Sequence, residues 1–278
     1  MTIEELLIFG KSHCHSDHAK ILLAELLNKN PLELLNYLNE EVDEEISNKY
    51  KKAVIALQEG KPLQYVLGKV NFYGNSFYVD ERVLIPRYET EELVENILYR
   101  YDEHFSGQKV NVCDLATGSG CIAISLALEE KNMTVIGTDI SKEAIKVAKQ
   151  NNEKLGANVK FLIGDMLEPL KGKKFDIFVS NPPYIPEAEE VMSLVKDNEP
   201  NIALFGGDDG MKFYRIILSG LKPYLNKKAM IAFEHGYDKK EEMIALANAY
   251  FPNSRVEVLK DLEGKDRMTF IYVGDFNE

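Results

Sequence analysis

Asn181-Pro-Pro-Tyr184 is the stretch whose residue types are best suited to chemistry. It directly follows the apolar run Phe175–Ser180, which predicts a buried strand. Proline cannot donate a hydrogen bond to a neighbouring strand, and it moves the residue before it out of helical geometry, so the strand must end at Asn181. The strand would therefore present an amide, a free backbone carbonyl and an aromatic ring at one edge of a sheet. Ligands of open α/β sheets bind at the carboxyl ends of the strands, which makes this corner the candidate reaction site.

A second candidate site lies in Asp114-Leu-Ala-Thr-Gly-Ser-Gly120, directly after the short apolar run 110–113. Glycines in such a loop let the backbone turn tightly and approach a ligand closely. Asp139 ends the next predicted strand, where a carboxylate can accept hydrogen bonds from both hydroxyls of a ribose. The third glycine of a dinucleotide-binding motif would fall at Ala123, which weakens an NAD-dependent reading. An NAD-dependent dehydrogenase would also need an acid–base residue at the fourth predicted strand, and the sequence has none there.

These residues need a sheet to position them, and the sequence from about residue 108 onward alternates between predicted strands and helices. Such βα alternation predicts a parallel sheet with helices on both faces. The predicted strands are 110–113, 134–138, 159–164, 175–180, 229–233, 255–259 and 268–273, and the predicted helices include 121–128, 141–152, 211–221 and 241–250.

The first part of the chain has a different pattern. Residues 1–68 predict a small helical domain: Thr2 and Glu5 form a capping-box pattern, and Pro31 is placed to begin a third helix. Aromatic runs within 70–79, separated by Gly74-Asn75-Ser76, predict a hairpin. We expect three parts: a helical domain over 1–68, a hairpin and linker over 69–90, and a catalytic domain over 91–278.

Composition limits the classes of partner. The formal net charge of −12 argues against a ligand held mainly through phosphates, because that affinity comes from Lys and Arg. No apolar run approaches the ~18 residues of a membrane span, so we expect no membrane partner. The three cysteines form no CxxC pair, which fits a reducing cytoplasm.

The group His13, Cys14, His15 and His18 has residue types that could bind a metal. The four lie within six positions and no second ligand pair follows downstream, so we interpret them as a solvated helix start and expect no metal.

The glycine loop, Asp139, Asp165 and the Asn-Pro-Pro-Tyr corner together resemble the S-adenosylmethionine methyltransferases that modify amino groups on planar carbon. The corner suits such a nucleophile, whose nitrogen lone pair is delocalised. The Asn181 side-chain oxygen and the Pro182 carbonyl can accept its two N–H groups, and they bind more tightly as positive charge develops on nitrogen. Tyr184 can stack on the planar group. Positioning would supply most of the rate.

Further motifs make the resemblance more specific. The chain is similar to the peptide chain release factor glutamine methyltransferases, the PrmC/HemK family. The matching segments extend from residue 62 to 236 and comprise Pro62–Tyr65, Gly68, Phe72, Gly74, Phe77, Val79, Leu84–Arg87, Glu89–Glu91, Glu199–Gly210, Glu234 and Gly236.

This resemblance implies a seven-stranded Rossmann-like fold preceded by a helical domain. It also implies methylation of the glutamine side chain in the Gly-Gly-Gln motif of class 1 release factors, which tunes translation termination. S-adenosylmethionine would be bound by Ala116, Thr117, Gly118, Ser119, Gly120, Asp139, Asp165 and Met166. Asn181 would touch both cofactor and substrate, with Pro182, Pro183 and Tyr184 lining the glutamine pocket. Residues 1–68 would help to dock the release factor.

Three residues depart from the family pattern: Tyr88 stands where a second Pro is usual, Ala116 where Gly or a small residue is usual, and Met166 where an aromatic is frequent. The alternative function is an adenine N6-methyltransferase acting on nucleic acid, since those enzymes share the Asn-Pro-Pro-Tyr motif. That activity needs a basic surface and room for a flipped base. A non-enzymatic module that binds S-adenosylmethionine without turnover would leave the intact corner unexplained. We expect no sequence-specific binding of nucleic acid.

Overall fold

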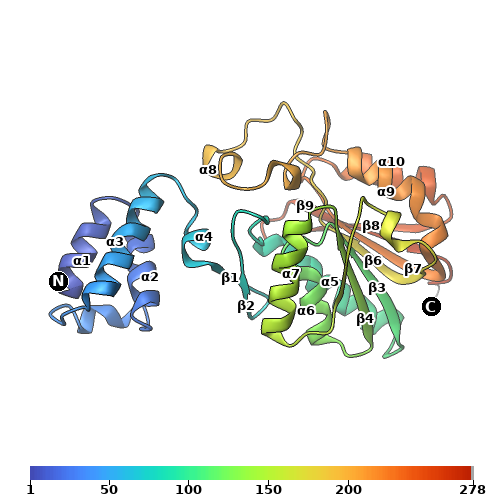
Figure 1. The fold of residues 1–278 in the computed structure, drawn as a ribbon. Helices are drawn as coiled ribbons and strands as arrows, with labels where there is room; N and C mark the ends of the chain where they lie inside the picture. The colour runs from blue at the N-terminus through green and yellow to red at the C-terminus, as the bar shows by residue number, and fades with distance from the viewer. Residues whose placement is uncertain (277–278) are drawn as a thin grey trace. The chain divides into compact units, whose positions relative to one another are not determined.

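A computed structural model describes residues 1–276 and divides the chain into two compact units (Figure 1). The first unit contains Met1–Val70 and Val191–Asn198, and the second contains Asn71–Glu190 and the chain from Glu199 onward. Within the described residues, no helix is both long enough and apolar enough to cross a membrane.

The first unit is helical and encloses a small apolar core. The Thr2 hydroxyl accepts a hydrogen bond from the Glu5 backbone N–H at 3.2 Å, and the Glu5 carboxylate accepts from the Thr2 N–H at 3.0 Å, which confirms the capping box. The core is built from apolar side chains such as Leu6, Leu23 and Tyr50. The unit consists of α1 (Ile3–Lys11), α2 (Ser16–Leu26), η1 (Glu33–Asn36), α3 (Glu44–Gln58), α4 (Leu63–Leu67) and α8 (Ser193–Lys196).

The prediction of a third α-helix after Pro31 is wrong, because only the short 3₁₀ turn η1 forms there. The residues that follow η1 bind the start of α1. The carbonyls of Leu38 and Glu40 accept hydrogen bonds from the Glu4 and Ile3 N–H groups, both at 3.0 Å. These N–H groups belong to the first turn of α1 and have no partner within that helix. A turn at Leu38 and Asn39 that presents these carbonyls to α1 cannot also continue a helix.

The second unit contains the seven-stranded sheet that the sequence predicts, in the order β5-β4-β3-β6-β7-β9-β8. β5, β4, β3, β6 and β7 run parallel, whereas β9 pairs antiparallel with both β7 and β8. The sequence order reverses between β3 and β6, which makes their carboxyl ends the topological switch point. The strands are β3 (Val110–Leu115), β4 (Met133–Asp139), β5 (Lys160–Ile163), β6 (Phe175–Ser180), β7 (Leu225–Glu234), β8 (Arg255–Lys260) and β9 (Asp266–Val273).

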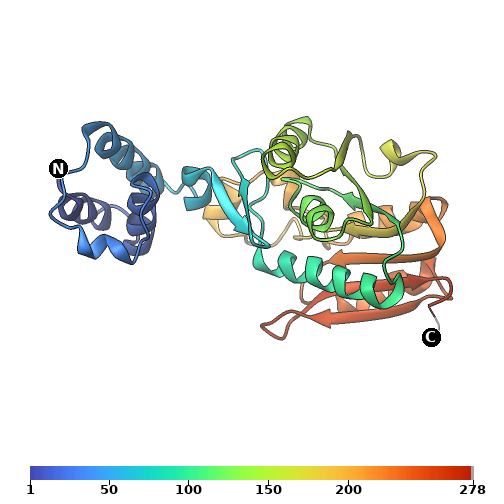
Figure 2. The same ribbon diagram turned by 90° about the horizontal axis from the view of Figure 1, so that it is seen from below.

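Helices cover both faces of this sheet, as Figures 1 and 2 show. On one face, apolar side chains of α9 (Lys212–Leu221) and α10 (Lys240–Tyr250), such as Ile217 and Met243, share a core with Phe178 and Phe233. α5 (Tyr88–His104), α6 (Cys121–Glu129) and α7 (Lys142–Leu155) pack on the other face. The sheet is therefore buried on both sides, which accounts for its nearly continuous apolar strands.

The predicted hairpin is confirmed as β1 (Lys69–Phe72) and β2 (Asn75–Tyr78), but its turn lies one residue earlier than expected. Tyr73 and Gly74 both have positive φ, 46° and 74°, so they form the two-residue turn, and Asn75 and Ser76 belong to β2.

A buried amide holds β2 of this hairpin against α7 within the second unit. The side chain of Asn151 on α7 is fully buried; it accepts a hydrogen bond from the Tyr78 N–H at 2.7 Å and donates to the carbonyls of Tyr78 and Ser119, both at 3.0 Å. A single side chain therefore connects β2, α7 and the glycine loop.

We expect Asn151→Ala to lower the free energy of unfolding by about 1–3 kcal/mol, because it removes the partner of the buried Ser119 carbonyl and of two partly buried backbone groups of Tyr78. Gln150, an exposed neighbour on the same helix, provides the matched control, and Gln150→Ala should change the same quantity by less than about 0.5 kcal/mol. Urea unfolding followed by circular dichroism measures both. Equal effects of the two substitutions would contradict the assignment.

Candidate active site

The predicted reaction corner lies at the switch point between β3 and β6. Leu115 and Ser180 are register partners at the ends of these strands, and the Ser180 hydroxyl donates to the Leu115 carbonyl at 2.6 Å. The two loops that follow therefore begin side by side. They border one pocket, lined by Arg82, Val83, Leu84, Leu115, Ala116, Gly118, Thr138, Asp139, Ile140, Ser141, Ala144, Gly164, Asp165, Met166, Asn181, Pro183, Pro200, Ile202, Ala203 and Phe213.

The glycine loop uses backbone conformations that side chains disfavour. Ala116, Gly118 and Gly120 all have positive φ, 59°, 55° and 82°. The left-handed region costs an L-residue roughly 1–2 kcal/mol, so Ala116 carries a conformational cost that glycine at this position would avoid. A Cβ at Gly118 would meet no atom within 4 Å, so the loop backbone is open there, on the side that lines the pocket.

The other predicted loop residues, Thr117, Ser119 and Gly120, do not line the pocket. The Thr117 hydroxyl donates to the buried Asp114 carboxylate at 2.5 Å, and the Ser119 carbonyl accepts from Asn151. A Cβ at Gly120 would lie 3.0 Å from Ile124, so this glycine allows close packing against α6. These residues shape the loop from behind.

Asp114 anchors the loop from inside the sheet. Its Oδ2 accepts from Thr117 and from the N–H of Ala123, the latter at 3.2 Å, while Oδ1 has no partner among residues 1–276. Burial raises the pKa of Asp114 to about 7, and its two hydrogen bonds act in the opposite direction.

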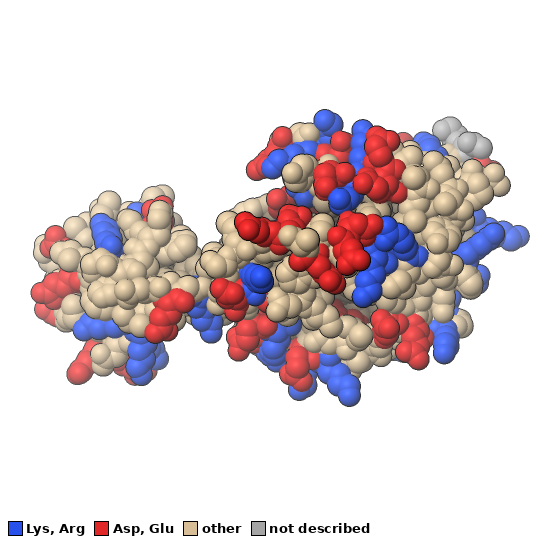
Figure 3. Space-filling view, turned by 90° about the horizontal axis from the view of Figure 1, so that it is seen from above, with Lys and Arg blue, Asp and Glu red and all other residues tan. Residues whose placement is uncertain are grey.

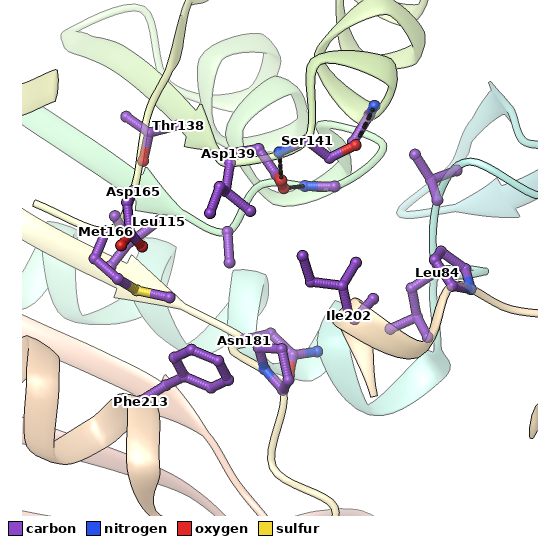
Figure 4. A pocket seen from close by; sticks show the side chains of 18 of the residues that line it. Leu84, Leu115, Thr138, Asp139, Ser141, Asp165, Met166, Asn181, Ile202 and Phe213 are labelled. Carbon is purple, nitrogen blue, oxygen red and sulfur yellow. Dashed lines mark hydrogen bonds between the residues drawn. The ribbon is translucent and has the colours of Figure 1, made fainter. Parts of the chain in front are cut away.

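Asp139 lies at the carboxyl end of β4, where the sequence places it. Its Oδ2 accepts from the Gly118 N–H at 2.9 Å and its Oδ1 from the Ser141 N–H at 2.8 Å (Figure 4). Each oxygen keeps lone-pair capacity for a further donor. Burial raises the pKa of Asp139, and the backbone hydrogen bonds oppose that shift. The carboxylate is thus held rigidly beside the pocket with acceptors to spare.

The remaining wall of the pocket is mostly apolar. Figure 4 shows Met166 and Phe213 near one another on one side, and Leu84 and Ile202 on another. Such side chains suit the faces of a planar heterocycle. Sequence reasoning identified Met166 but missed Phe213, which reaches the pocket from α9, and no local pattern in the sequence identifies it.

The reaction corner brings the four predicted residues of the motif together. Asn181 and Pro183 line the pocket, Pro182 is buried and does not line it, and the Tyr184 ring packs against the core that α9 and α10 share with the sheet. Burial raises the pKa of the Tyr184 hydroxyl, which keeps it protonated at neutral pH. The Asn181 amide nitrogen donates to the Thr90 hydroxyl at 3.2 Å.

A glycine-rich segment after the corner packs directly on its backbone. Ile185 forms an isolated parallel bridge with Phe205, and the Gly206 N–H donates to the Ile185 carbonyl at 2.8 Å. A Cβ at Gly210 would lie 2.2 Å from the Tyr184 carbonyl oxygen. Only glycine fits there, so Gly206 and Gly210 hold the corner in place.

Glu199 links that segment to the entrance of α5. Its side chain is almost fully buried; it accepts from Arg87 at 2.5 Å and from the Ile85 N–H at 3.0 Å. This pair fixes Leu84 and Pro200, which both line the pocket. Two motifs far apart in the sequence, at 84–87 and 199–210, therefore form one wall.

Comparisons with known proteins place the chain among methyltransferases. Residues 106–204 match the family described as "Methyltransferase domain", and residues 15–68 match "PrmC N-terminal domain". The chain is 46% identical over 255 residues to a release factor glutamine methyltransferase of Bacillus cereus, covering 90% of both chains. It is 44% identical to one of Bacillus subtilis, covering 90% of this chain and 88% of that protein. A methyltransferase structure from Pyrococcus furiosus, 18% identical, shares the fold with a TM-score of 0.54 over 73% of this chain and 91% of that chain.

Gly210→Ala tests the role of the glycine-rich segment. Gly172 is a matched control, because its φ of 77° resembles the 74° of Gly210 while a Cβ there would meet nothing within 4 Å. Gly172→Ala should cost only the conformational strain, about 1–2 kcal/mol in the free energy of unfolding. Gly210→Ala should cost clearly more, by about 1–3 kcal/mol for the added overlap. Equal losses in thermal or urea unfolding would contradict the proposed packing.

Proposed function

Because the chain belongs to the release factor glutamine methyltransferases, we propose that it methylates a glutamine side-chain amide of peptide chain release factors, using S-adenosylmethionine. The glutamine is that of the Gly-Gly-Gln motif of class 1 release factors, as the motif resemblance implies. The observation that carries the proposal is that Asn181 borders the same pocket as Gly118 and Asp139.

The pocket residues fit S-adenosylmethionine. Asp139 offers unused acceptor capacity for ribose hydroxyls, and the open backbone at Gly118 leaves room for a ligand. Met166 and Phe213 supply apolar contact for an adenine ring. We propose that Ala116, Gly118, Asp139, Asp165, Met166 and Asn181 contact the cofactor directly, while Thr117, Ser119 and Gly120 support the loop.

The corner residues position the nucleophile. When bound, S-adenosylmethionine supplies a methyl group activated by a sulfonium. The Asn181 oxygen and the Pro182 carbonyl accept the two N–H groups of the glutamine amide, and Tyr184 with Pro183 confines its plane. Positive charge that develops on the amide nitrogen strengthens both hydrogen bonds, so this stabilisation is greatest in the transition state. Because the nitrogen becomes acidic only after transfer, no strong base is needed.

The helical residues at the start of the chain are the proposed docking site for the release factor. We propose that residues 1–68 recognise the release factor, that 69–90 form the hairpin and linker, and that 91–278 form the methyltransferase domain. We also propose that the protein acts in the cytoplasm; its three cysteines are all free.

On the face shown in Figure 3, acidic and basic side chains are interspersed on the larger unit, and no extended basic surface is visible there. Together with the formal net charge of −12, this face supports a protein substrate over nucleic acid.

The substrate is tested by methyl transfer from labelled S-adenosylmethionine to three acceptors: intact release factor, a release factor in which the Gly-Gly-Gln glutamine is replaced, and duplex DNA. We expect label on the intact release factor alone, because the corner is built to hold a primary amide. Label on DNA would replace the proposal with the adenine N6-methyltransferase alternative.

Two substitutions separate catalysis from cofactor binding. Asn181→Ala should abolish transfer and weaken S-adenosylmethionine binding only by about 0.5–1.5 kcal/mol, the contribution of one hydrogen bond. Asp139→Ala should instead weaken binding itself, by roughly 1.5–3 kcal/mol for hydrogen bonds to a charged group. Turnover assays and calorimetry measure the two effects. Unchanged turnover in the first variant, or normal binding in the second, would refute the corresponding role.

A further inference from the structure

We propose that Thr90 and Glu234 are positioning residues that fix which end of the Asn181 side-chain amide faces the substrate. This inference rests on the proposed function and adds two residues that the family resemblance leaves without a role. Both belong to short motifs noted in the sequence, Glu89-Thr-Glu91 and Glu234-x-Gly236, which lie far apart in the chain.

The structure brings these motifs together behind the reaction corner. Thr90 lies in the first turn of α5 and Glu234 is the last residue of β7, next to β6, which delivers Asn181. The Asn181 Nδ2 donates to the Thr90 Oγ1 at 3.2 Å, and the Thr90 hydroxyl donates to the Glu234 Oε2 at 2.7 Å. Thr90 and Glu234 are 3% and 1% exposed, so water cannot replace either partner freely.

The number of available protons determines which group donates in each of these two hydrogen bonds. An ionised carboxylate can only accept hydrogen bonds, and a hydroxyl carries a single proton. With Glu234 ionised, that proton of Thr90 is committed to Glu234, and only lone pairs of Thr90 remain for Asn181. Asn181 must therefore turn its NH₂ group toward Thr90. Its Oδ1 is then free to accept an N–H from the glutamine amide.

A protonated Glu234 would remove this constraint. It could donate to Thr90, whose own proton could then point to the Asn181 Oδ1. The amide would turn over and present NH₂ to the NH₂ of the substrate, which places two donors against each other.

The surroundings of Glu234 bring the pKa of its carboxyl group close to neutral pH. Burial raises the pKa of Glu234 to about 7; the hydrogen bonds from Thr90 and Asn181 and the charge of Arg267 lower it, and Glu89 raises it. The Tyr184 hydroxyl also faces the carboxyl group, 3.5 Å from Oε1. The productive orientation of Asn181 is therefore favoured above this pH and lost below it.

Thr90→Val is the direct test, because valine keeps the shape of threonine and removes the hydroxyl. We expect kcat for release factor methylation to fall by about 10–100-fold, as misplacement of a positioning group does. The KM for release factor and the Kd of S-adenosylmethionine should change by less than about threefold, because Thr90 does not line the pocket and residues 1–68 are proposed to recognise the release factor. Thr90→Ser, which restores the hydroxyl, should recover most of kcat.

The pH profile supplies a measurement that a purely structural pair would not affect. In the wild-type protein, kcat should rise with pH through about 7 as Glu234 ionises. In Thr90→Val it should be low and show no such step. Glu234→Gln cannot ionise, and its amide carries both a donor and an acceptor, as the protonated carboxyl group does, so its kcat should stay near the low-pH level of the wild-type protein and also lack the step.

The outcomes separate this inference from the proposed function. If the wild-type protein does not methylate release factor, the proposed function fails. If it does, and Thr90→Val keeps the wild-type kcat or the wild-type pH step, the positioning role is refuted. Equal losses in Thr90→Val and Thr90→Ser would also refute it, because the shared hydroxyl would then be irrelevant. Should Thr90→Val not fold, the profile of Glu234→Gln decides: a persistent step near pH 7 would overturn the proposal.

Discussion

The site depends on the adjacency of β3 and β6. These parallel strands end at matched positions, Leu115 and Ser180, and the Ser180 hydroxyl connects them across their last residues. The chain leaves β3 toward β4 on one side, whereas β6 lies on the other side of β3. The two following loops must therefore diverge from a common edge and leave a pocket between them. Everything else in the site refines the shape of these two loops.

The positions of these two loops are fixed by backbone geometry and by buried polar side chains. The positive φ angles of the glycine loop, the close approach of Gly210 to the Tyr184 carbonyl and the buried Glu199 carboxylate all restrict where a loop can lie. Asn151 adds a similar constraint by binding β2 and the glycine loop with one amide. None of these groups needs to touch a substrate to matter, because the positioning that we propose for the corner depends on loops that do not move.

The parts of the site that could be predicted from the sequence are those encoded locally. A Pro-Pro pair ends a strand wherever it occurs, and the strand–helix alternation predicts the parallel core of the sheet and the position of Asp139. The predicted helix after Pro31 fails because residues 38–40 serve the N-terminus of α1, a demand that no local pattern shows. Phe213 and the meeting of Thr90 with Glu234 are equally non-local. The motifs around these last two were visible in the sequence, but their contact depends on the packing of α5 against the end of β7.

Two buried carboxylates support the two loops in the same manner. Asp114 accepts from the Thr117 hydroxyl under the glycine loop, and Glu234 accepts from the Thr90 hydroxyl behind the reaction corner. Burial raises the pKa of both to about 7, from ordinary values of 3.8 and 4.5. Because each pKa is higher in the folded chain than in the unfolded chain, each group contributes less to stability as the pH rises from its ordinary pKa to about 7. On our proposal for Glu234, the ionised form is also the one that orients Asn181. The reaction corner is therefore most ordered for catalysis in the pH range where that carboxylate contributes least to stability, which is the compromise expected when a buried charge is retained for function.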